Sequence, residues 1–157
     1  MIVSHDVLVR RDRIVLRIVD GEDPIMRRVA EQCYEALHRP FGVVRCDSWN
    51  ETDPSSTHLV ALDGEHLVGY ARLLREGATG HIRQVIVDPA YRRRRIGAQL
   101  VGVLLDQLRS EGFAIVYLNA RLPAVPMYRR LGFRVAGNEF RMPRTWLRHV
   151  RMEQRLR

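Results

Sequence analysis

The chain has 157 residues, 46% of them hydrophobic and 28% charged, and a formal net charge of +8. This length suits one domain spanning residues 1–157, and the composition is that of a packed globular protein, which excludes a disordered chain and a fibrous repeat. All 26 basic residues are arginine, so chemistry that needs a lysine, such as a Schiff base, is excluded. The positive charge either favours anionic partners or reflects the coding bias of the source organism.

The cysteines and histidines lack the spacing of a metal site. Cys33 and Cys46 have no second cysteine or histidine at ligand spacing, and the six histidines show no H-x-x-x-H pattern. We therefore expect no metal, and we expect both cysteines to be small buried hydrophobic residues. No stretch approaches the ~20 apolar residues of a membrane span, and the N-terminus lacks the apolar segment of a signal peptide. These features predict a cytoplasmic protein with no membrane partner.

The N-terminal part of the chain predicts two strands and a helix. Residues 7–19 are β-branched and partly alternating, which predicts a hairpin with a turn at Asp12, or one long bent strand. Apolar residues recur at helical spacing over residues 25–37. Asp23 is the expected N-cap of this helix, with Pro24 at its first position.

The middle of the chain predicts a loop and then three antiparallel strands. Residues 41–57 have no sustained period and predict a loop, in which Trp49 either lines a pocket or packs the loop onto the core. Asp63 and Gly64 form a strong hairpin signal between the first two strands that follow. The three predicted strands are 58–62, 65–74 and 81–87.

Residues 84–105 predict a buried strand, a basic turn and an amphipathic helix. Val85, Ile86 and Val87 form the apolar run of the strand, and Pro89 ends it. The first amides of the helix have no intrahelical acceptor, and the aligned peptide dipoles place about +0.5 charge there, so an anion is the natural ligand. The helix start also carries Arg92, Arg93, Arg94 and Arg95. Amides and guanidinium groups together suit a phosphate.

The rest of the chain predicts a parallel crossover and a closing strand pair. Gly112 suits the end of the helix, and the apolar strand 114–118 should lie parallel to the strand before the helix. A short helix is expected within residues 121–131. Strands 133–136 and 147–152 then close the sheet. This order of elements predicts an α/β domain with a central mixed sheet.

Two motifs resemble those of a known enzyme family. Residues 92–97, Arg-Arg-Arg-Arg-Ile-Gly, resemble the pyrophosphate-binding motif [QR]-x-x-G-x-[GA] of the GNAT superfamily of acetyl-CoA-dependent N-acetyltransferases. The first glycine of that motif is Arg95 here, and its amide can donate if its φ is negative. Residues 126–133 resemble the F-Y-x-x-x-G-F signature of the family, with Met127 in the first position. The resemblance covers roughly residues 59–152.

The resemblance implies a fold and a mode of cosubstrate binding. The fold is of the α+β type, with a GNAT-like central mixed, mostly antiparallel sheet flanked by helices and with splayed parallel strands around 81–87 and 114–119. Acetyl-CoA would lie with its pyrophosphate on the amides of the turn and its arm along the strand edge. Asn119 either binds this arm or caps a helix or turn. The implied cosubstrate-binding residues are Val85, Ile86, Val87, Arg92, Arg93, Arg94, Arg95, Ile96, Gly97, Ala98, Asn119 and Tyr128.

The resemblance also implies catalytic roles. Tyr128 matches the tyrosine that protonates the departing CoA sulfur in the family; the alternative is that its ring only packs under a helix. His81 occupies the position of a glutamate base in several members, and it is either the general base or an ordinary surface or hydrogen-bonding residue. Glu76 and Glu139 are further candidates for the base. His149 either shapes the acceptor pocket or fills the last strand.

We therefore expect an N-acetyltransferase that uses acetyl-CoA and an unidentified amine, and the resemblance implies that such chains can pair as homodimers. One alternative is a non-catalytic CoA-binding protein of the same fold, because Arg95 replaces the motif glycine. Another is a basic nucleic-acid-binding module. The sequence lacks the interleaved aromatic residues and the fingerprints of the common modules, so nucleic acid is not an expected partner.

Overall fold

The structure is a computed structural model, and it describes residues 9–11, 13–44 and 56–157. Trp49, Cys46 and most of the predicted loop 41–57 lie outside the described residues. Cys33, in contrast, is buried as expected.

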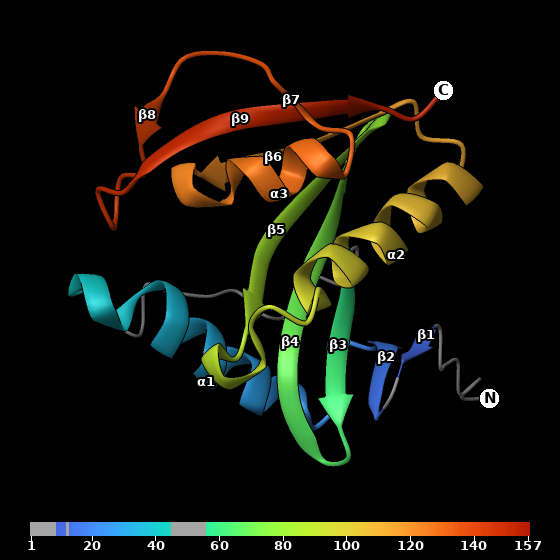
Figure 1. Cartoon of the computed structure of the whole chain (residues 1–157), viewed down its shortest axis with the longest axis vertical. Coiled ribbons are helices and arrows are strands. Elements are labelled where there is room, and N and C mark those ends of the chain that lie inside the picture. The colour runs from blue at the N-terminus through green and yellow to red at the C-terminus, as the bar shows by residue number, and fades with distance from the viewer. Residues whose placement is uncertain (1–8, 12, 45–55) are drawn as a thin grey trace.

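The described residues form a nine-stranded mixed sheet in the order β1-β2-β3-β4-β5-β6-β9-β7, and β8 also pairs with β9 (Figure 1). The pair β5 and β6 is parallel, and the other pairs are antiparallel. The strands are β1 Val9–Arg11, β2 Ile14–Val19, β3 Thr57–Asp63, β4 His66–Glu76, β5 Thr79–Val87, β6 Ile115–Arg121, β7 Arg134–Val135, β8 Phe140–Arg141 and β9 Arg148–Arg155. The predicted mixed, mostly antiparallel sheet is therefore confirmed.

The helices are α1 Met26–Leu37, α2 Ile96–Ser110 and α3 Val125–Arg130, with short 3₁₀ turns η1 Arg39–Phe41, η3 Pro89–Tyr91 and η4 Leu122–Ala124. Helix α1 begins slightly later than predicted, because its N-cap position is Ile25 and not Asp23. The Asp23 side chain instead accepts a hydrogen bond from the backbone amide of Ile25 at 2.9 Å, in the turn just before the helix. Among the described residues, no helix is both long enough and apolar enough to cross a membrane.

Helices cover both faces of the sheet, and β3 shows how its strands alternate between them. Leu59 and Ala61 belong to the core cluster under α2, whereas Val60 and Leu62 belong to the cluster under α1. Because successive side chains of a strand point to opposite faces, β3 is buried from both sides. We refer below to the α1 face and the α2 face.

The C-terminal strands differ from the prediction. Strand β9 extends to Arg155, three residues beyond the predicted end, and the short strand β8 was not predicted.

Strand β5 is less buried than predicted. Only Ile86 of the apolar run before Pro89 is buried, and Val85 and Val87 are half-buried. The prediction of a fully buried strand is therefore only partly correct.

Two glycines allow a matched test of the packing on the α2 face. A Cβ added at Gly80 would lie 2.6 Å from Leu108, whereas one added at Gly102, inside α2, meets nothing within 4 Å. We expect Gly80→Ala to lower the free energy of unfolding by about 1–3 kcal/mol through overpacking. Gly102→Ala should instead raise it by about 0.5–1 kcal/mol, because alanine is the better helix former. Urea denaturation measures both, and a Gly80→Ala protein as stable as the wild type would contradict the packing described here.

Candidate active site

The sheet opens between its two parallel strands. β5 and β6 pair only at Thr79–Ile115, Gly80–Val116 and His81–Tyr117. Beyond the last pair, β5 continues to Val87 alongside β4, and β6 continues to Arg121 alongside β9 (Figure 1). The facing edges of β5 and β6 are therefore unpaired with each other beyond His81 and Tyr117. This is the predicted splay, and it explains why Val87 is half-buried.

A β-bulge in β5 lies at the start of this opening. Tyr70 pairs with Ile86 but Arg72 pairs with Arg83, so two residues of β5, one of them Gln84, oppose a single residue of β4. Gln84 has a φ of 56°, in the left-handed region. Such a bulge bends its strand and increases the local twist. It also reverses the side-chain alternation, so that Ile86 packs on the α1 face.

The predicted anion site lies at the N-terminus of α2. The backbone amide of Gln99 donates to the carbonyl of Arg95 at 3.0 Å, and no side chain caps the helix. The amides of Ile96, Gly97 and Ala98 therefore precede the first intrahelical donor. A pocket of about 560 Å³ opens at this point. It is lined by Arg13, Ile14, Asp63, Tyr91, Arg93, Arg94, Arg95, Ile96 and Gln99.

The backbone of the basic turn corrects one expectation. The φ of Arg95 is 59° and that of Arg93 is 67°, so the condition of a negative φ at Arg95 is not met. Arg95 instead takes the left-handed conformation for which glycine is best suited, and the turn keeps this geometry at a cost of about 1–2 kcal/mol.

This cost can be measured with two substitutions at one position. Arg95→Gly and Arg95→Ala both remove the guanidinium group, but only glycine relieves the left-handed backbone. We expect the glycine variant to exceed the alanine variant in free energy of unfolding by about 1 kcal/mol, the strain being partly offset by the greater freedom of glycine in the unfolded chain. Urea denaturation of the two variants gives this difference. Equal stabilities would mean that Arg95 is not held at a positive φ.

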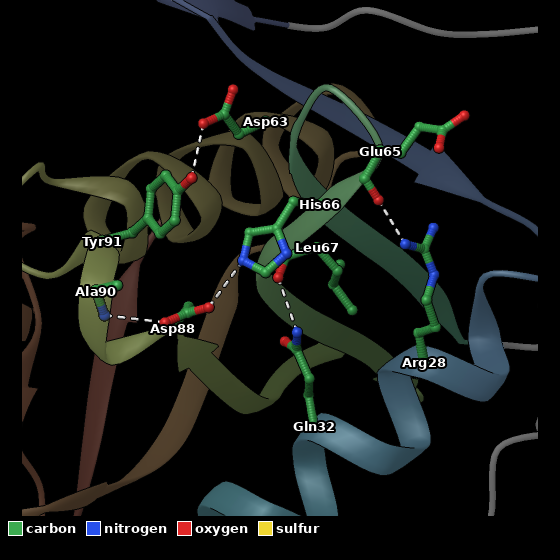
Figure 2. Close-up of polar contacts among 9 residues, drawn as sticks. All are labelled: Arg28, Gln32, Asp63, Glu65, His66, Leu67, Asp88, Ala90 and Tyr91. Atoms are coloured by element: carbon green, nitrogen blue, oxygen red, sulfur yellow. Dashed lines mark hydrogen bonds and ion pairs between the residues drawn. The ribbon is translucent and has the colours of Figure 1, made fainter.

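A network of polar contacts fixes the turn that leads into this site (Figure 2). The Asp88 carboxylate accepts from the Ala90 amide at 2.9 Å and contacts Nε2 of His66 at 3.0 Å. The Tyr91 hydroxyl donates to Asp63 at 2.7 Å, and this bond raises the pKa of Tyr91. Both contacts tie η3 to the β3–β4 hairpin, so the approach to α2 is anchored. The sequence indicated Asp63 only as a turn residue.

Helix α1 holds the same hairpin from the other side. Gln32 donates to the carbonyl of Leu67 at 2.8 Å, and Arg28 donates to the carbonyl of Glu65 (Figure 2). These bonds connect α1 through the hairpin to the turn before α2.

A cluster of four polar and aromatic side chains lies where β5 and β6 separate. The Glu76 carboxylate contacts Nδ1 of His81 at 2.9 Å and accepts from the Tyr117 hydroxyl at 2.7 Å. The rings of His81 and Tyr117 stack with centroids 4.1 Å apart. The guanidinium group of Arg151 lies 3.9 Å from the centre of the Tyr117 ring and binds Glu153 at 2.9 Å. Four strands, β4, β5, β6 and β9, meet in this cluster.

The electrostatics of the cluster define the state of His81. Burial lowers the pKa of His81, and the hydrogen bond and charge of Glu76 only partly oppose this. Hydrogen bonds from Tyr117 and His81 lower the pKa of Glu76, so its carboxylate stays ionised and acts only as an acceptor. His81 is therefore neutral at pH 7 with its proton on Nδ1, which makes Nε2 the basic nitrogen. Burial and the bond to Glu76 raise the pKa of Tyr117 to about 12.

Tyr128 lies in α3, on the α2 face. It is buried, its ring meets Phe133 edge to face with centroids 5.8 Å apart, and burial raises its pKa to about 12. A Cβ at Gly97 would lie 3.5 Å from Sδ of Met127 and 3.7 Å from Val87. The start of α2, the end of β5 and the helix of Tyr128 are therefore neighbours.

The remaining predicted residues have different surroundings. Asn119 is half-buried in the separated part of β6, and it is not a helix cap, because neither η4 nor α3 is capped by a side chain. Glu139 pairs with Arg148 on the far side of β9, away from the His81 cluster. His149 donates from Nδ1 to the carbonyl of Leu147 at 2.9 Å, and its ring stacks on that of Phe140 in β8. These contacts favour the prediction that His149 fills space in the last strand. Within the described ranges, no group of three metal-ligating side chains occurs.

Comparison with known proteins identifies the family. The sequence pattern of the acetyltransferase (GNAT) family matches residues 23–133. The chain belongs to the GNAT acetyltransferase family. The chain is also similar to N-alpha-acetyltransferase RimI of Mycobacterium tuberculosis: the two are 37% identical over 127 residues, which cover 72% of this chain and 77% of RimI. The predicted assignment to the N-acetyltransferases is therefore confirmed.

Two further GNAT proteins show the extent of the likeness. Glucosamine 6-phosphate N-acetyltransferase of Trypanosoma brucei brucei is 38% identical over 65 residues, which is 41% of this GNAT chain and only 44% of that enzyme. The crystal structure of an aminoglycoside 6'-N-acetyltransferase complexed with coenzyme A has a TM-score of 0.71 and 16% identity, and the match covers 89% of this chain and 97% of the other. The GNAT fold is thus present over most of the chain.

Proposed function

We propose that this GNAT protein transfers the acetyl group of acetyl-CoA to a primary amine that attacks the thioester directly. The observation that carries the proposal is the separation of β5 and β6 directly after His81 and Tyr117. The buried, neutral His81 lies at the inner end of this opening, and after its outer end at Val87 the chain leads into the N-terminus of α2.

The residues at the outer end fit the anionic part of acetyl-CoA. The amides of Ile96, Gly97 and Ala98 would receive the pyrophosphate, and the exposed side chains of Arg92 to Arg95 would add cations. The absence of a side-chain cap at this helix leaves those donors to a ligand.

The cleft itself fits the extended arm of the cosubstrate. The unpaired edges of β5 and β6 carry backbone donors and acceptors at Val85, Val87 and Asn119, which an amide-containing chain between the strands can pair with. The side-chain amide of Asn119 adds one donor and one acceptor. Ile86 packs its side chain on the α1 face and directs its backbone groups to β4, so it does not contribute to this opening.

At the inner end of the opening, the lone pair of the amine would attack the carbonyl carbon of the acetyl thioester of acetyl-CoA. An alkylamine with a pKa near 10.4 is only about 1 part in 2500 free base at pH 7, so removal of its proton is a large part of the barrier. Nε2 of His81 accepts this proton, directly or through a water molecule. Glu76 fixes the ring tautomer and stabilises the imidazolium ion that forms. Tyr128 donates a proton to the sulfur as the carbon–sulfur bond breaks.

Thermal denaturation combined with thiol release tests the proposal. Acetyl-CoA at 100 times its dissociation constant should stabilise the protein by about 2.7 kcal/mol. Thiol release should then appear with at least one member of a panel of amino acids, peptides, amino sugars and polyamines. Stabilisation without thiol release across the panel would favour the non-catalytic CoA-binding alternative. No stabilisation by acetyl-CoA or CoA would overturn the proposal.

A further inference from the structure

The net charge of the chain is concentrated at its C-terminal end. Residues 129–157 contain nine arginines and two glutamates, a net charge of +7, whereas residues 1–128 contain 17 arginines and 16 acidic residues, a net charge of +1. A coding bias toward arginine would act on the whole chain alike. The local excess therefore indicates a local role for positive charge.

The fold places much of this charge along one edge of the sheet. Strands β7 and β8 both pair with the outer side of β9, where Arg134 faces Glu153 and Arg141 faces Arg148 (Figure 1). Along β9, the distance from Glu153 to the β8–β9 turn is about 20 Å at ~3.3 Å per residue. We call this surface the arginine edge. It consists of Arg134, Val135, Phe140 and Arg141 of β7 and β8, and of Arg144 and Trp146 between β8 and β9. By the strand register, Arg134 and Phe140 project from one face of the sheet and Arg141 from the other.

The arginine edge also exposes aromatic rings. Of the four exposed large hydrophobic side chains in the described part of the chain, three belong to it: Trp146 is 65% exposed, Val135 41% and Phe140 37%. Trp146 has a φ of 61°, an unfavourable conformation for this residue type. Its carbonyl accepts a hydrogen bond from Arg141 at 2.9 Å, so an arginine of the edge holds the turn that presents the ring. A strained backbone that displays an exposed tryptophan is typical of a functional surface.

A pocket lies at the other end of the arginine edge. It has a volume of about 440 Å³, and its lining includes Arg134, Val135, Glu153, Gln154 and Arg155. The side-chain oxygen of Gln154 is buried and has no hydrogen-bond partner among the described residues. A buried acceptor without a donor is costly, but this oxygen is closed to solvent, so a ligand with N–H groups reaches it only after the Gln154 side chain turns toward the pocket. Arg134 and Arg155 bring two positive charges to the pocket and Glu153 brings one negative charge.

We infer that the arginine edge binds single-stranded nucleic acid. Phosphates contact Arg134, Arg141 and Arg144, bases stack on Phe140 and Trp146, and one base enters the pocket of Gln154. Guanidinium groups bind phosphate in bidentate fashion and also stack on bases, and aromatic rings supply the stacking on which single-strand binders depend. Contrary to the expectation from the sequence, Phe140 and Trp146 alternate with arginines on this edge, and an acidic protein would account for the arginines but not for these exposed rings. This inference is independent of acetyl transfer.

Fluorescence anisotropy of a labelled 12-nucleotide oligouridine tests the inference on the full-length protein. With four arginine–phosphate contacts, including Arg155 of the pocket, the logarithm of the affinity should fall with the logarithm of salt with a slope of about −3. Affinity should then drop roughly 50-fold between 50 and 200 mM NaCl. Trp146→Ala should weaken binding about 10-fold without changing the slope, because stacking carries no counterion release. Arg144→Gln should reduce the slope by about 0.7.

Arg27→Gln is the matched control, because Arg27 is an exposed arginine of α1, far along the sheet from β9, and its substitution removes the same charge. It should change neither the affinity nor the slope. Each variant should keep the wild-type melting temperature and its stabilisation by acetyl-CoA, since the substituted side chains are exposed. Oligouridine binding that Trp146→Ala and Arg144→Gln weaken no more than Arg27→Gln does would overturn the inference. So would the absence of oligouridine binding together with binding to polyglutamate or to vesicles containing phosphatidylserine.

Discussion

Replacing His81 with alanine should slow acetyl transfer by about 10²–10⁴-fold at neutral pH, with little change in the dissociation constant of acetyl-CoA. The imidazole is the buried, neutral base at the point where β5 and β6 part, and alanine cannot take up the proton of the attacking amine. The loss should be greatest at neutral pH and smaller at alkaline pH, where more of the amine is already free base. Steady-state kinetics from pH 5 to 9 and acetyl-CoA titrations give the two quantities.

Glu76→Gln distinguishes a base held by its neighbour from a histidine that only fills space. The Glu76 carboxylate raises the pKa of His81 against the effect of burial, so its removal should move the acid limb of the kcat/KM profile to lower pH. A glutamine at position 76 also no longer fixes the proton on Nδ1 of His81, so turnover should fall at all pH values. An unshifted acid limb would show that His81 is not the titrating base. Unchanged turnover in His81→Ala would remove it from the mechanism.

The same histidine should affect stability. Burial holds its pKa below the ordinary value of 6.5, so below that pH the unfolded chain binds a proton that the folded chain does not. The free energy of unfolding should therefore decrease as the pH falls from about 6.5 through the folded-state pKa. In His81→Ala this contribution is absent, and urea denaturation at pH 7 and pH 5 should show a smaller loss than in the wild type.

Tyr128→Phe should lower turnover by about 10²-fold while the affinity for acetyl-CoA stays within a few-fold of the wild type. Burial raises the pKa of Tyr128 to about 12, so the phenol keeps its proton over the whole working range and can give it to the departing sulfur. Phenylalanine keeps the ring and its edge-to-face contact with Phe133, so the fold should be unaffected. Without the phenol, the sulfur must leave as a thiolate.

Rapid-quench measurement of a single turnover and calorimetric titration of acetyl-CoA separate chemistry from binding in this variant. Phe133→Leu is a useful companion, because it disturbs the packing of the Tyr128 ring and leaves the hydroxyl in place. If Tyr128→Phe turns over at the wild-type rate, the phenol only packs under the helix. A rise in the dissociation constant that accounts for the whole loss would assign it to binding.

The elements that the sequence predicted well depend on local patterns. The Asp63–Gly64 signal gave the β3–β4 hairpin, because a type of turn is encoded by the residues within it. The helical repeat gave α2, and the crossover rule gave the parallel placement of β6. The start of α2 could be predicted as an anion site for the same reason, since every helix start has free amides.

The parts of the site that the sequence did not predict depend on long-range register. Tyr117 and Glu76 are 41 residues apart, and their hydrogen bond exists only because β5 and β6 are paired at His81. That register joins two strands that α2 separates in the sequence, and periodicity does not encode it. Arg151 joins the cluster from β9 for the same reason.

Backbone conformation was also out of reach in two places. The left-handed Arg95 contradicts the ordinary preference of arginine, because the tight turn into α2 overrides it. The bulge at Gln84 leaves no local mark in an otherwise regular strand pattern, since the extra residue is recognised only against the partner strand. The family resemblance implies a bulge in the first of the two splayed strands, but the residues themselves do not place it.

The opening between β5 and β6 has a consequence for how such proteins diverge. A ligand in this opening would contact mostly the main chain of β5 and β6, and every amino acid carries the same peptide group. Substitutions along these two strands can therefore accumulate without altering the backbone donors and acceptors in the opening, provided that the strands still separate at the same residue. In agreement with this, a chain only 16% identical to this one has the same fold.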